Sequence, residues 1–241
     1  MNKNNIWFIT PKTNLHVGNE NTSSYGLIDL AVQRNATTGL PCINSSSLKG
    51  ALNEYAAKKM GMESNDLIKI FGSDKVKENG YVRNDKTQKG QYSFFEANIL
   101  FIPVQDDNNL YHLVTAPVVL DRFRCQVAIF GIKLNSDNKA LIEELKRTIE
   151  INKPIEIIEN KKFDELCSDD NLPIIARNVL DNGESKNLWY EQVVPAEAIF
   201  YTLIDSGNDN TLAGKLNEEA IVQIGANATI GYGYCLFTNF K

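Results

Sequence analysis

The order of the apolar segments constrains this chain more than any other feature of its sequence. A β-type apolar run at residues 6–10 comes first, and a helix that starts at Ser45–Ser47 and stops at Gly61 follows. We expect the serines to cap that helix, because their hydroxyls accept hydrogen bonds from the free amides of a first turn. Its apolar side chains recur at helical spacing: Leu48, Ala51, Leu52, Tyr55 and Ala56.

The later segments complete a strand–helix–strand–strand–helix–strand order. The patterns predict strands and helices in the following ranges: strands at 94–104, 111–119, 198–204 and 235–240, and helices at 122–130, 140–151 and 212–221. That order is the split βαβ arrangement of ferredoxin-like and RNA-recognition folds. We therefore expect a single α+β domain over residues 1–241, with a modified ferredoxin-like or RNA-recognition-motif fold.

Two segments interrupt this pattern and are predicted to be insertions. Residues 73–91 are rich in Lys, Gly and Asn and have almost no apolar side chains, which is typical of a mobile polar surface loop. Residues 152–187 are irregular and charged, so we expect them to protrude from the domain. Apart from these two insertions, we expect the apolar segments to form one core.

Charge is distributed unevenly along the chain, although its net value is −5. Residues 1–90 carry 12 Lys and Arg against 8 Asp and Glu, whereas residues 91–241 carry 13 against 22. A basic first part is compatible with an anionic partner that follows one groove, and chance clustering is the alternative. No run reaches the ~20 apolar residues of a membrane span, and no secretory signal pattern opens the chain. We therefore expect no membrane partner and a cytoplasmic location.

Four cysteines lie far apart, without a CxxC pair, and only two histidines accompany them. This spacing disfavours a zinc site and a disulfide framework. We expect Cys42, Cys125, Cys167 and Cys235 to be small core or near-surface residues.

The start of the predicted helix is the first candidate site. Ser46, Ser47, Lys49 and Gly50 lie where unpaired amides and the helix dipole attract anions. A lysine in the first turn opposes the dipole unless a phosphate shares the position. An ordinary serine cap beside a solvated lysine is the alternative.

A glycine-rich segment near the end of the chain is the second candidate. Gly225, Asn227, Gly231 and Gly233 belong to it, and glycines allow positive φ and the close approach of another backbone. The amides of such a loop can hold phosphates. A β-turn with a bulge explains the same residues without any ligand.

Asp29 is the third candidate, because a carboxylate between Ile28 and Leu30 needs a partner if it is buried. Arg34 or a backbone amide could supply that partner. Alternatively, Asp29 lies at an exposed turn near a scissile phosphate and helps to hold Mg²⁺ or Mn²⁺, which prefer oxygen ligands.

His16 and Glu191 are weaker candidates for catalysis. His16 could donate a proton or a hydrogen bond to phosphate, or it could be an ordinary surface residue. Glu191 follows Trp189 and Tyr190, an aromatic pair that could simply anchor a loop to the core.

Taken in order, these segments resemble the RAMP-superfamily subunit that forms the helical backbone of type III-B CRISPR (Cmr) effector complexes. The resemblance fades at residues 73–91 and 132–187. It is carried by the following segments: Leu15–Gly18, Gly26–Arg34, Thr38–Pro41, Ser46–Leu52, Ile70–Gly72, Ile99–Val104, Val114–Pro117, Leu188–Glu191 and Gln223–Gly233.

The resemblance implies a RAMP fold with a protruding thumb, and copies that stack into a filament along guide CRISPR RNA beside other Cmr subunits. Complementary target RNA would be cut next to each thumb with a divalent metal. Asp29 stands at the family's cleavage position, while the helix start and the glycine-rich segment stand at its guide contacts. His16 and Glu191 would be secondary cleavage residues. Arg34, in the same matching segment as Asp29, would be an RNA-binding residue.

Three hypotheses remain open at this level. The first is a guide-binding backbone subunit that is also a metal-dependent endoribonuclease, in either a Cmr complex or the sister Csm complex. The second is a non-catalytic guide-binding subunit, which Asn53, Ala226 and Ala228 motivate because they depart from the family pattern. The third is an unrelated ferredoxin-like enzyme that holds a phosphorylated small molecule at the helix start.

Overall fold

The computed structural model describes residues 3–18, 28–73, 76–78, 81–83, 87–182, 184–207, 209–216 and 220–240. Its strands are β1 (Ile6–Pro11), β2 (Cys42–Ile43), β3 (Val76–Glu78), β4 (Tyr81–Arg83), β5 (Ser93–Phe94), β6 (Ala97–Asp106), β7 (Leu110–Thr115), β8 (Ile155–Ile157), β9 (Ile174–Asp181), β10 (Glu184–Gln192), β11 (Ile199–Asp205), β12 (Ile221–Gln223) and β13 (Tyr234–Asn239). Its α-helices are α1 (Ser45–Lys58), α2 (Ser64–Phe71), α3 (Pro117–Ala128), α4 (Asn138–Ile149), α5 (Asn160–Leu166) and α6 (Thr211–Leu216).

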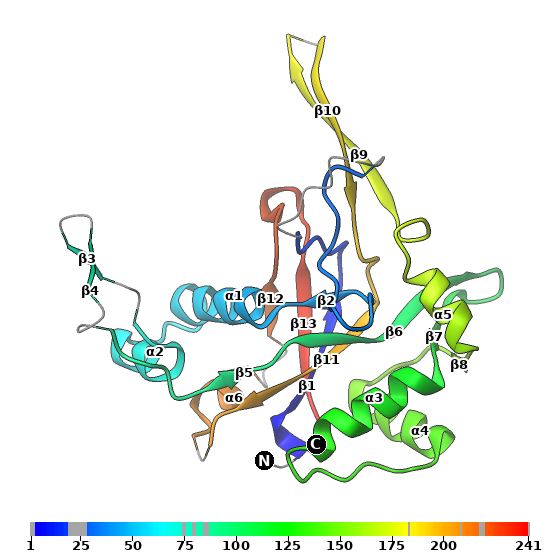
Figure 1. Ribbon diagram of the computed structural model, residues 1–241, viewed down its shortest axis with the longest axis horizontal. Coiled ribbons are helices and arrows are strands. Elements are labelled where there is room, and N and C mark those ends of the chain that lie inside the picture. The colour runs from blue at the N-terminus through cyan, green and yellow to red at the C-terminus, as the bar shows by residue number, and fades with distance from the viewer. Residues whose placement is uncertain are drawn as a thin grey trace.

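The core of the domain is an antiparallel sheet that contains the strand order β13–β1–β11–β6 (Figure 1). In chain order these strands are the fourth, first, third and second, which is the order of a ferredoxin-like sheet. The predicted α+β fold is therefore confirmed. β12 extends the sheet at one end, and β7 and β8 extend it at the other.

The strands predicted at 94–104 and 111–119 are neighbours, as expected, since β6 pairs with β7. However, β7 lies outside β6 and ends before α3 begins at Pro117, so it is not one of the four core strands. The third strand is β11, which the chain reaches only after an excursion through β7 to β10. Apolar patterns identify strands without telling which strand is the neighbour, so an insertion of this size is invisible to them.

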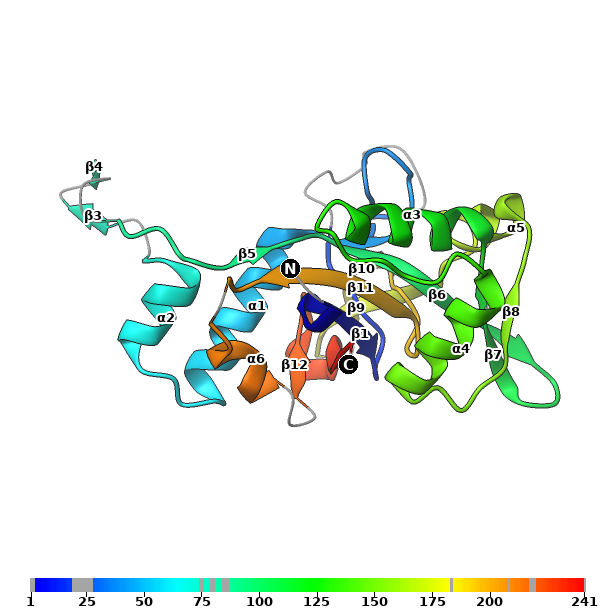
Figure 2. The ribbon, with the colours of Figure 1, turned by 90° about the horizontal axis from the view of Figure 1, so that it is seen from below.

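β1 is buried along its whole length, and its alternate side chains serve two layers. Phe8 lies 6.2 Å from Phe123 of α3 and 5.7 Å from Phe240, between ring centroids. Trp7 lines a cavity of about 330 Å³ with Leu212 of α6 on the other side. Figure 2 shows α3 and α6 on different sides of the sheet.

The predicted protrusion at 152–187 has two different parts. β8 pairs with β7 in the main sheet, and α5 follows it. Only β9 and β10 leave the body, as an antiparallel hairpin that stands out at the top of Figure 1. This thumb hairpin, residues 174–192, ends five residues beyond the predicted limit.

Other boundaries also differ from those predicted. The helix α1 begins as expected, but Asn44 rather than a serine is its N-cap residue. α3 begins at Pro117 because proline suits a first helical turn, and α6 ends at Leu216 before the short strand β12. The predicted polar loop at 73–91 contains the paired strands β3 and β4.

Cys42, Cys167 and Cys235 are buried and Cys125 is exposed, so the predicted core or near-surface placement is confirmed. Burial raises the pKa of the Cys42 and Cys167 thiols to about 12, which keeps them protonated and unreactive at neutral pH. Among the helices in the described ranges, none has the length and apolar character needed to cross a bilayer.

Phe123 connects α3 to the sheet, since its ring lies 4.5 Å from that of Tyr201 as well as near Phe8. We predict that Phe123→Ala lowers the free energy of unfolding by about 3–5 kcal/mol, because it empties a fully buried position. Val118→Ala on the same helix should change it by less than about 0.5 kcal/mol, because that side chain is 47% exposed. Denaturant unfolding of both variants tests this, and equal losses would contradict it.

Candidate nucleic-acid interface and cleavage site

Asp29 lies at the root of the thumb hairpin with its side chain exposed. Its Oδ2 accepts a hydrogen bond of 2.8 Å from the backbone amide of Tyr190. In return, the amides of Asp29 and Leu30 donate to the Tyr190 carbonyl oxygen at 3.0 and 3.1 Å. The carboxylate is thus both accessible and fixed in position by backbone hydrogen bonds from β10.

Arg34 does not pair with Asp29, although the sequence allowed that pairing. Its Nε and Nη2 contact Asp169 Oδ1 at 2.9 and 2.7 Å, and its Nη1 donates to the carbonyl oxygens of Gly39 and Cys167. The guanidinium therefore connects the 34–39 turn to the segment between α5 and β9. All of these bonds are internal to the protein.

Glu191 and His16 are buried and lie together. Glu191 Oε2 is 3.0 Å from Arg177 Nη1, and its Oε1 is 3.5 Å from His16 Nδ1. The side-chain amide of Asn227 also donates to Oε1. His16 Nδ1 lies 2.7 Å from the carbonyl oxygen of Gln192, so this nitrogen donates and must carry a proton.

The glycine-rich segment packs on the backbone of residues 14–16. The amide of Ala226 donates to the carbonyl oxygen of His16, and that of Gly233 donates to the carbonyl oxygen of Asn14, both at 2.9 Å. Gly225 has φ +82°, and a Cβ there would lie 2.2 Å from the His16 oxygen. Gly231 has φ +84°, but a Cβ there would meet nothing within 4 Å.

The start of α1 has an uncapped first turn. Asn44 makes no side-chain cap hydrogen bond, and no acidic residue lies in that turn. The first amides of a helix have no partner within it, so Ser46 and Ser47 stand where an anion would be attracted. Lys49 is partly exposed and Gly50 is exposed, both at the start of the second turn.

Gln33 joins this helix start to residues 28–34, which contain Asp29 and which we call the Asp29 segment. Its Oε1 accepts a 2.8 Å hydrogen bond from the amide of Asn44, and its Nε2 donates to Ser47 Oγ at 3.3 Å. The candidate residues therefore belong to one connected region. Asp29 is joined to the thumb, the thumb to the glycine-rich segment, and the Asp29 segment to α1.

Sequence reasoning missed three residues of this region: Arg177, Gln33 and Gln192. Arg177 lies in a stretch that was predicted to be irregular, and β-pairing across the thumb is what brings it to Glu191. The Gln192 side chain is fully buried, accepts from the amide of Val32 at 3.3 Å and donates to the Asp169 carbonyl oxygen at 3.1 Å. A buried glutamine has no recognisable pattern in a single sequence.

The fit of a divalent metal rests on Asp29 alone. The described residues contain no group of three or more His, Cys, Asp or Glu side chains that could hold a metal. Mg²⁺ commonly takes one or two protein carboxylates and completes its shell with substrate phosphates and water. One exposed carboxylate therefore suits a metal that arrives with RNA, and it does not suit a resident metal cage.

The fold is an RNA-recognition-type α+β domain that carries an inserted hairpin beside an exposed carboxylate. The RAMP superfamily model matches residues 8–236. The chain belongs to the RAMP superfamily.

One curated relative is the CRISPR system Cmr endoribonuclease Cmr4 of Pyrococcus furiosus, 28% identical over 268 aligned residues that cover 88% of each chain. Among solved structures, a chain of the type III-B Cmr-beta apo state matches with TM-score 0.76 and 21% identity, covering 98% of this chain and 96% of that one. The oligomeric Cmr4 from Pyrococcus furiosus matches with TM-score 0.71 and 24% identity, covering 97% and 96%. These structures share the fold described above.

The two glycines of the glycine-rich segment allow a matched test of its packing. Alanine at either Gly225 or Gly231 carries the strain of a positive φ, about 1–2 kcal/mol. We predict that Gly225→Ala destabilises the protein further than Gly231→Ala, because only the first substitution collides with the His16 backbone. Thermal unfolding of the two variants measures the difference. Equal midpoints would show that the segment does not rest on residues 14–16.

Proposed function

We propose that this chain is a backbone subunit of a type III-B CRISPR (Cmr) effector complex, which binds guide CRISPR RNA and cuts complementary target RNA. Membership of the RAMP superfamily and the likeness to Cmr4 along most of both chains support this function. The observation that carries the cleavage role is Asp29, an exposed carboxylate fixed at the root of the thumb hairpin.

The partners in this proposal are guide RNA, target RNA, further copies of this chain in a filament, and other Cmr subunits. Solved relatives include a Cmr-beta complex bound to cognate target RNA and an oligomeric Cmr4. Such a complex would work in the cytoplasm, where guide and target RNA meet. Base pairing would then select the target, while the protein reads backbone and shape.

RNA can be cut by its own 2′-hydroxyl, which loses its proton and attacks the adjacent phosphate once the two are in line. The bond from phosphorus to the 5′-oxygen then breaks, and that oxygen leaves and takes up a proton from water. The protein then has to splay the target strand and to hold it in that geometry. In this mechanism, the projecting thumb hairpin displaces the strand, and Asp29 lies beside the displaced nucleotide. The hydrogen bonds with the Tyr190 backbone fix the orientation of the Asp29 carboxylate, while the rest of the Asp29 side chain stays exposed.

Asp29 would also be the protein ligand of a Mg²⁺ or Mn²⁺ ion. When bound, that ion would neutralise charge on the attacked phosphate. Such a site needs few protein groups, since the RNA provides both the nucleophile and further oxygen ligands. His16 and Glu191 would support the site from behind, since both side chains are buried.

Guide RNA would lie across the start of α1 and the glycine-rich segment. Ser46 and Ser47 offer the uncapped turn, while Lys49 offers a positive charge and Gly50 an open surface at the start of the next turn. A Cβ on Gly231 would meet nothing within 4 Å, while Gly225, Asn227 and Gly233 hold the segment against the protein. Arg34 would act by fixing the 34–39 turn.

The cleavage role is tested by Asp29→Asn in a complex reconstituted with guide RNA and labelled complementary RNA. Asparagine can still accept the hydrogen bond from Tyr190, so the complex should assemble and bind target. Its loss of charge should abolish cutting, with a rate reduction of at least about a hundredfold. Asp107→Asn, at an exposed turn, is the matched control.

Evenly spaced products from the wild type with Mg²⁺ or Mn²⁺, and none with EDTA, are the expected result. Cutting by Asp29→Asn at the wild-type rate would remove Asp29 from the mechanism. Intact target in every lane, with the complex assembled and target bound, would favour the non-catalytic guide-binding subunit.

The guide contact is tested separately by Lys49→Ala. If Lys49 contacts one phosphate, its loss should weaken guide binding and reduce the slope of log K against log salt by about 0.7, as for single-stranded RNA. Lys162→Ala, an exposed lysine on α5, should leave both quantities unchanged. Binding isotherms at several salt concentrations measure the slope, and equal slopes for the two variants would argue against the contact.

A further inference from the structure

The buried carboxylate of Glu191 joins three segments that are far apart in the sequence. It faces Arg177 from β9, His16 from the first loop (residues 12–18, after β1) and Asn227 from the glycine-rich segment. Glu191 is fully buried, whereas the Arg177 side chain is 23% exposed. A buried charge is tolerated only with a partner, and Arg177 is the partner in direct ionic contact.

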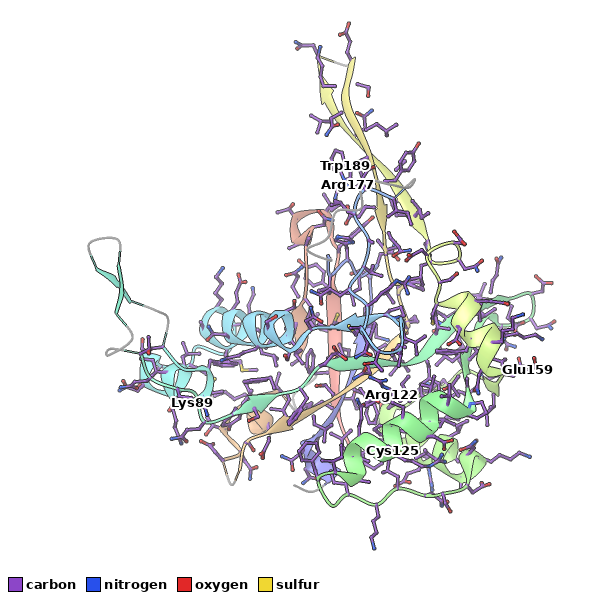
Figure 3. The ribbon with its side chains drawn as sticks, in the orientation of Figure 1. Lys89, Arg122, Cys125, Glu159, Arg177 and Trp189 are labelled. Atoms are coloured by element: carbon purple, nitrogen blue, oxygen red, sulfur yellow. The ribbon has the colours of Figure 1, made fainter. Side chains whose placement is uncertain are left out.

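Arg177 is itself fixed between two groups. In the pairing of β9 with β10 it lies opposite Trp189, and its guanidinium is 5.3 Å from the centre of the Trp189 ring. Glu191 is two residues further along β10, on the same face of the hairpin. Figure 3 shows Arg177 and Trp189 together in the thumb hairpin. The ring and the carboxylate together fix the orientation of the guanidinium.

The same strand position determines where Asp29 sits. Glu191 directly follows Tyr190, whose backbone amide donates the hydrogen bond to Oδ2 of Asp29. Leu30 forms a parallel bridge with Glu191, and the Gln192 amide donates to the Leu30 carbonyl oxygen at 2.9 Å. A shift of Glu191 therefore moves Tyr190 and carries the Asp29 segment with it.

We propose that Arg177 is a positioning residue for target cleavage: it neutralises buried Glu191 and thereby holds the root of the thumb hairpin, and with it Asp29, in the cutting position. Arg177 acts through Glu191 without contacting the scissile phosphate. Asn227 extends the same connection to the glycine-rich segment. This inference rests on the proposed function and adds a residue to its cleavage site.

The test compares Arg177→Met, Glu191→Gln and the double variant in the reconstituted complex. Methionine keeps much of the arginine length, and glutamine keeps the shape of Glu191, so each single variant leaves one buried partner without its counter-charge. We expect Arg177→Met to slow single-turnover cutting at saturating target by about tenfold to a hundredfold, as misplacement of a catalytic group does. Target affinity should stay within about threefold of wild type.

The double variant separates positioning from a direct RNA contact. It removes both charges, so it should cut faster than Arg177→Met. Arg177→Lys keeps a positive charge and should recover part of the rate. Arg147→Met, an exposed arginine on α4, is the matched control and should cut like wild type.

Three outcomes would overturn the inference. Wild-type cutting by Arg177→Met would show that the ion pair does not position Asp29. A double variant as slow as Arg177→Met, with target affinity also reduced, would show that Arg177 contacts the RNA directly. A double variant that assembles but stays slow with unchanged affinity would show that charge balance is not what Arg177 supplies.

Assembly and the wild-type control keep these results interpretable. If Arg177→Met does not assemble, the double variant carries the test, because it leaves no unpaired buried charge. A wild-type complex that binds target but does not cut it would overturn the proposed nuclease function itself. If instead the wild type cuts and the Arg177 variants cut at the same rate, only the positioning role of Arg177 is overturned.

Discussion

The candidate site depends on one buried charge. A carboxylate removed from water must be matched by a cation and by hydrogen bonds, or it destabilises the fold. Glu191 meets this requirement with Arg177, His16 and Asn227, which come from three separated parts of the chain. Its position is therefore determined jointly by the thumb hairpin, the first loop and the glycine-rich segment. The Asp29 segment is attached to the strand residues on either side of Glu191.

In this arrangement, the exposed carboxylate of Asp29 and the projecting thumb hairpin are supported by the rigid core sheet. The core sheet holds β1 between β11 and β13, and the first loop continues directly from β1. The glycine-rich segment packs on that loop through close backbone contacts that only glycine allows at Gly225. Above this base the thumb hairpin projects outward, while Asp29 stays exposed at its root. A projecting element with a fixed carboxylate beside it suits a polymer that must be bent and then cut.

Prediction from sequence succeeded where the signal was local and failed where it was not. Residues 6–10, the helix after Asn44 and the last strand were found because periodicity and turn residues act over a few positions. β11 was not recognised as the third core strand, because the inserted segments separate it from β6 along the chain. The thumb hairpin was expected as an irregular insertion, since its exposed strands carry no apolar alternation. Asp29, His16 and Glu191 were selected as site candidates, but without the contact between His16 and Glu191 or the hydrogen bond from Tyr190 to Asp29.

The sequence by itself determined the α+β class, the main apolar segments and the set of candidate residues. These follow from side-chain type and short-range spacing, which can be interpreted without knowing which distant segments meet in the fold. Only the tertiary structure decided that Arg34 pairs with Asp169, that Arg177 pairs with Glu191, and that His16 is buried. Such pairings depend on which distant segments meet in space, because the partner of a buried charge is the residue that the fold places next to it. The roles of these residues are therefore properties of the assembled fold, which no single segment encodes.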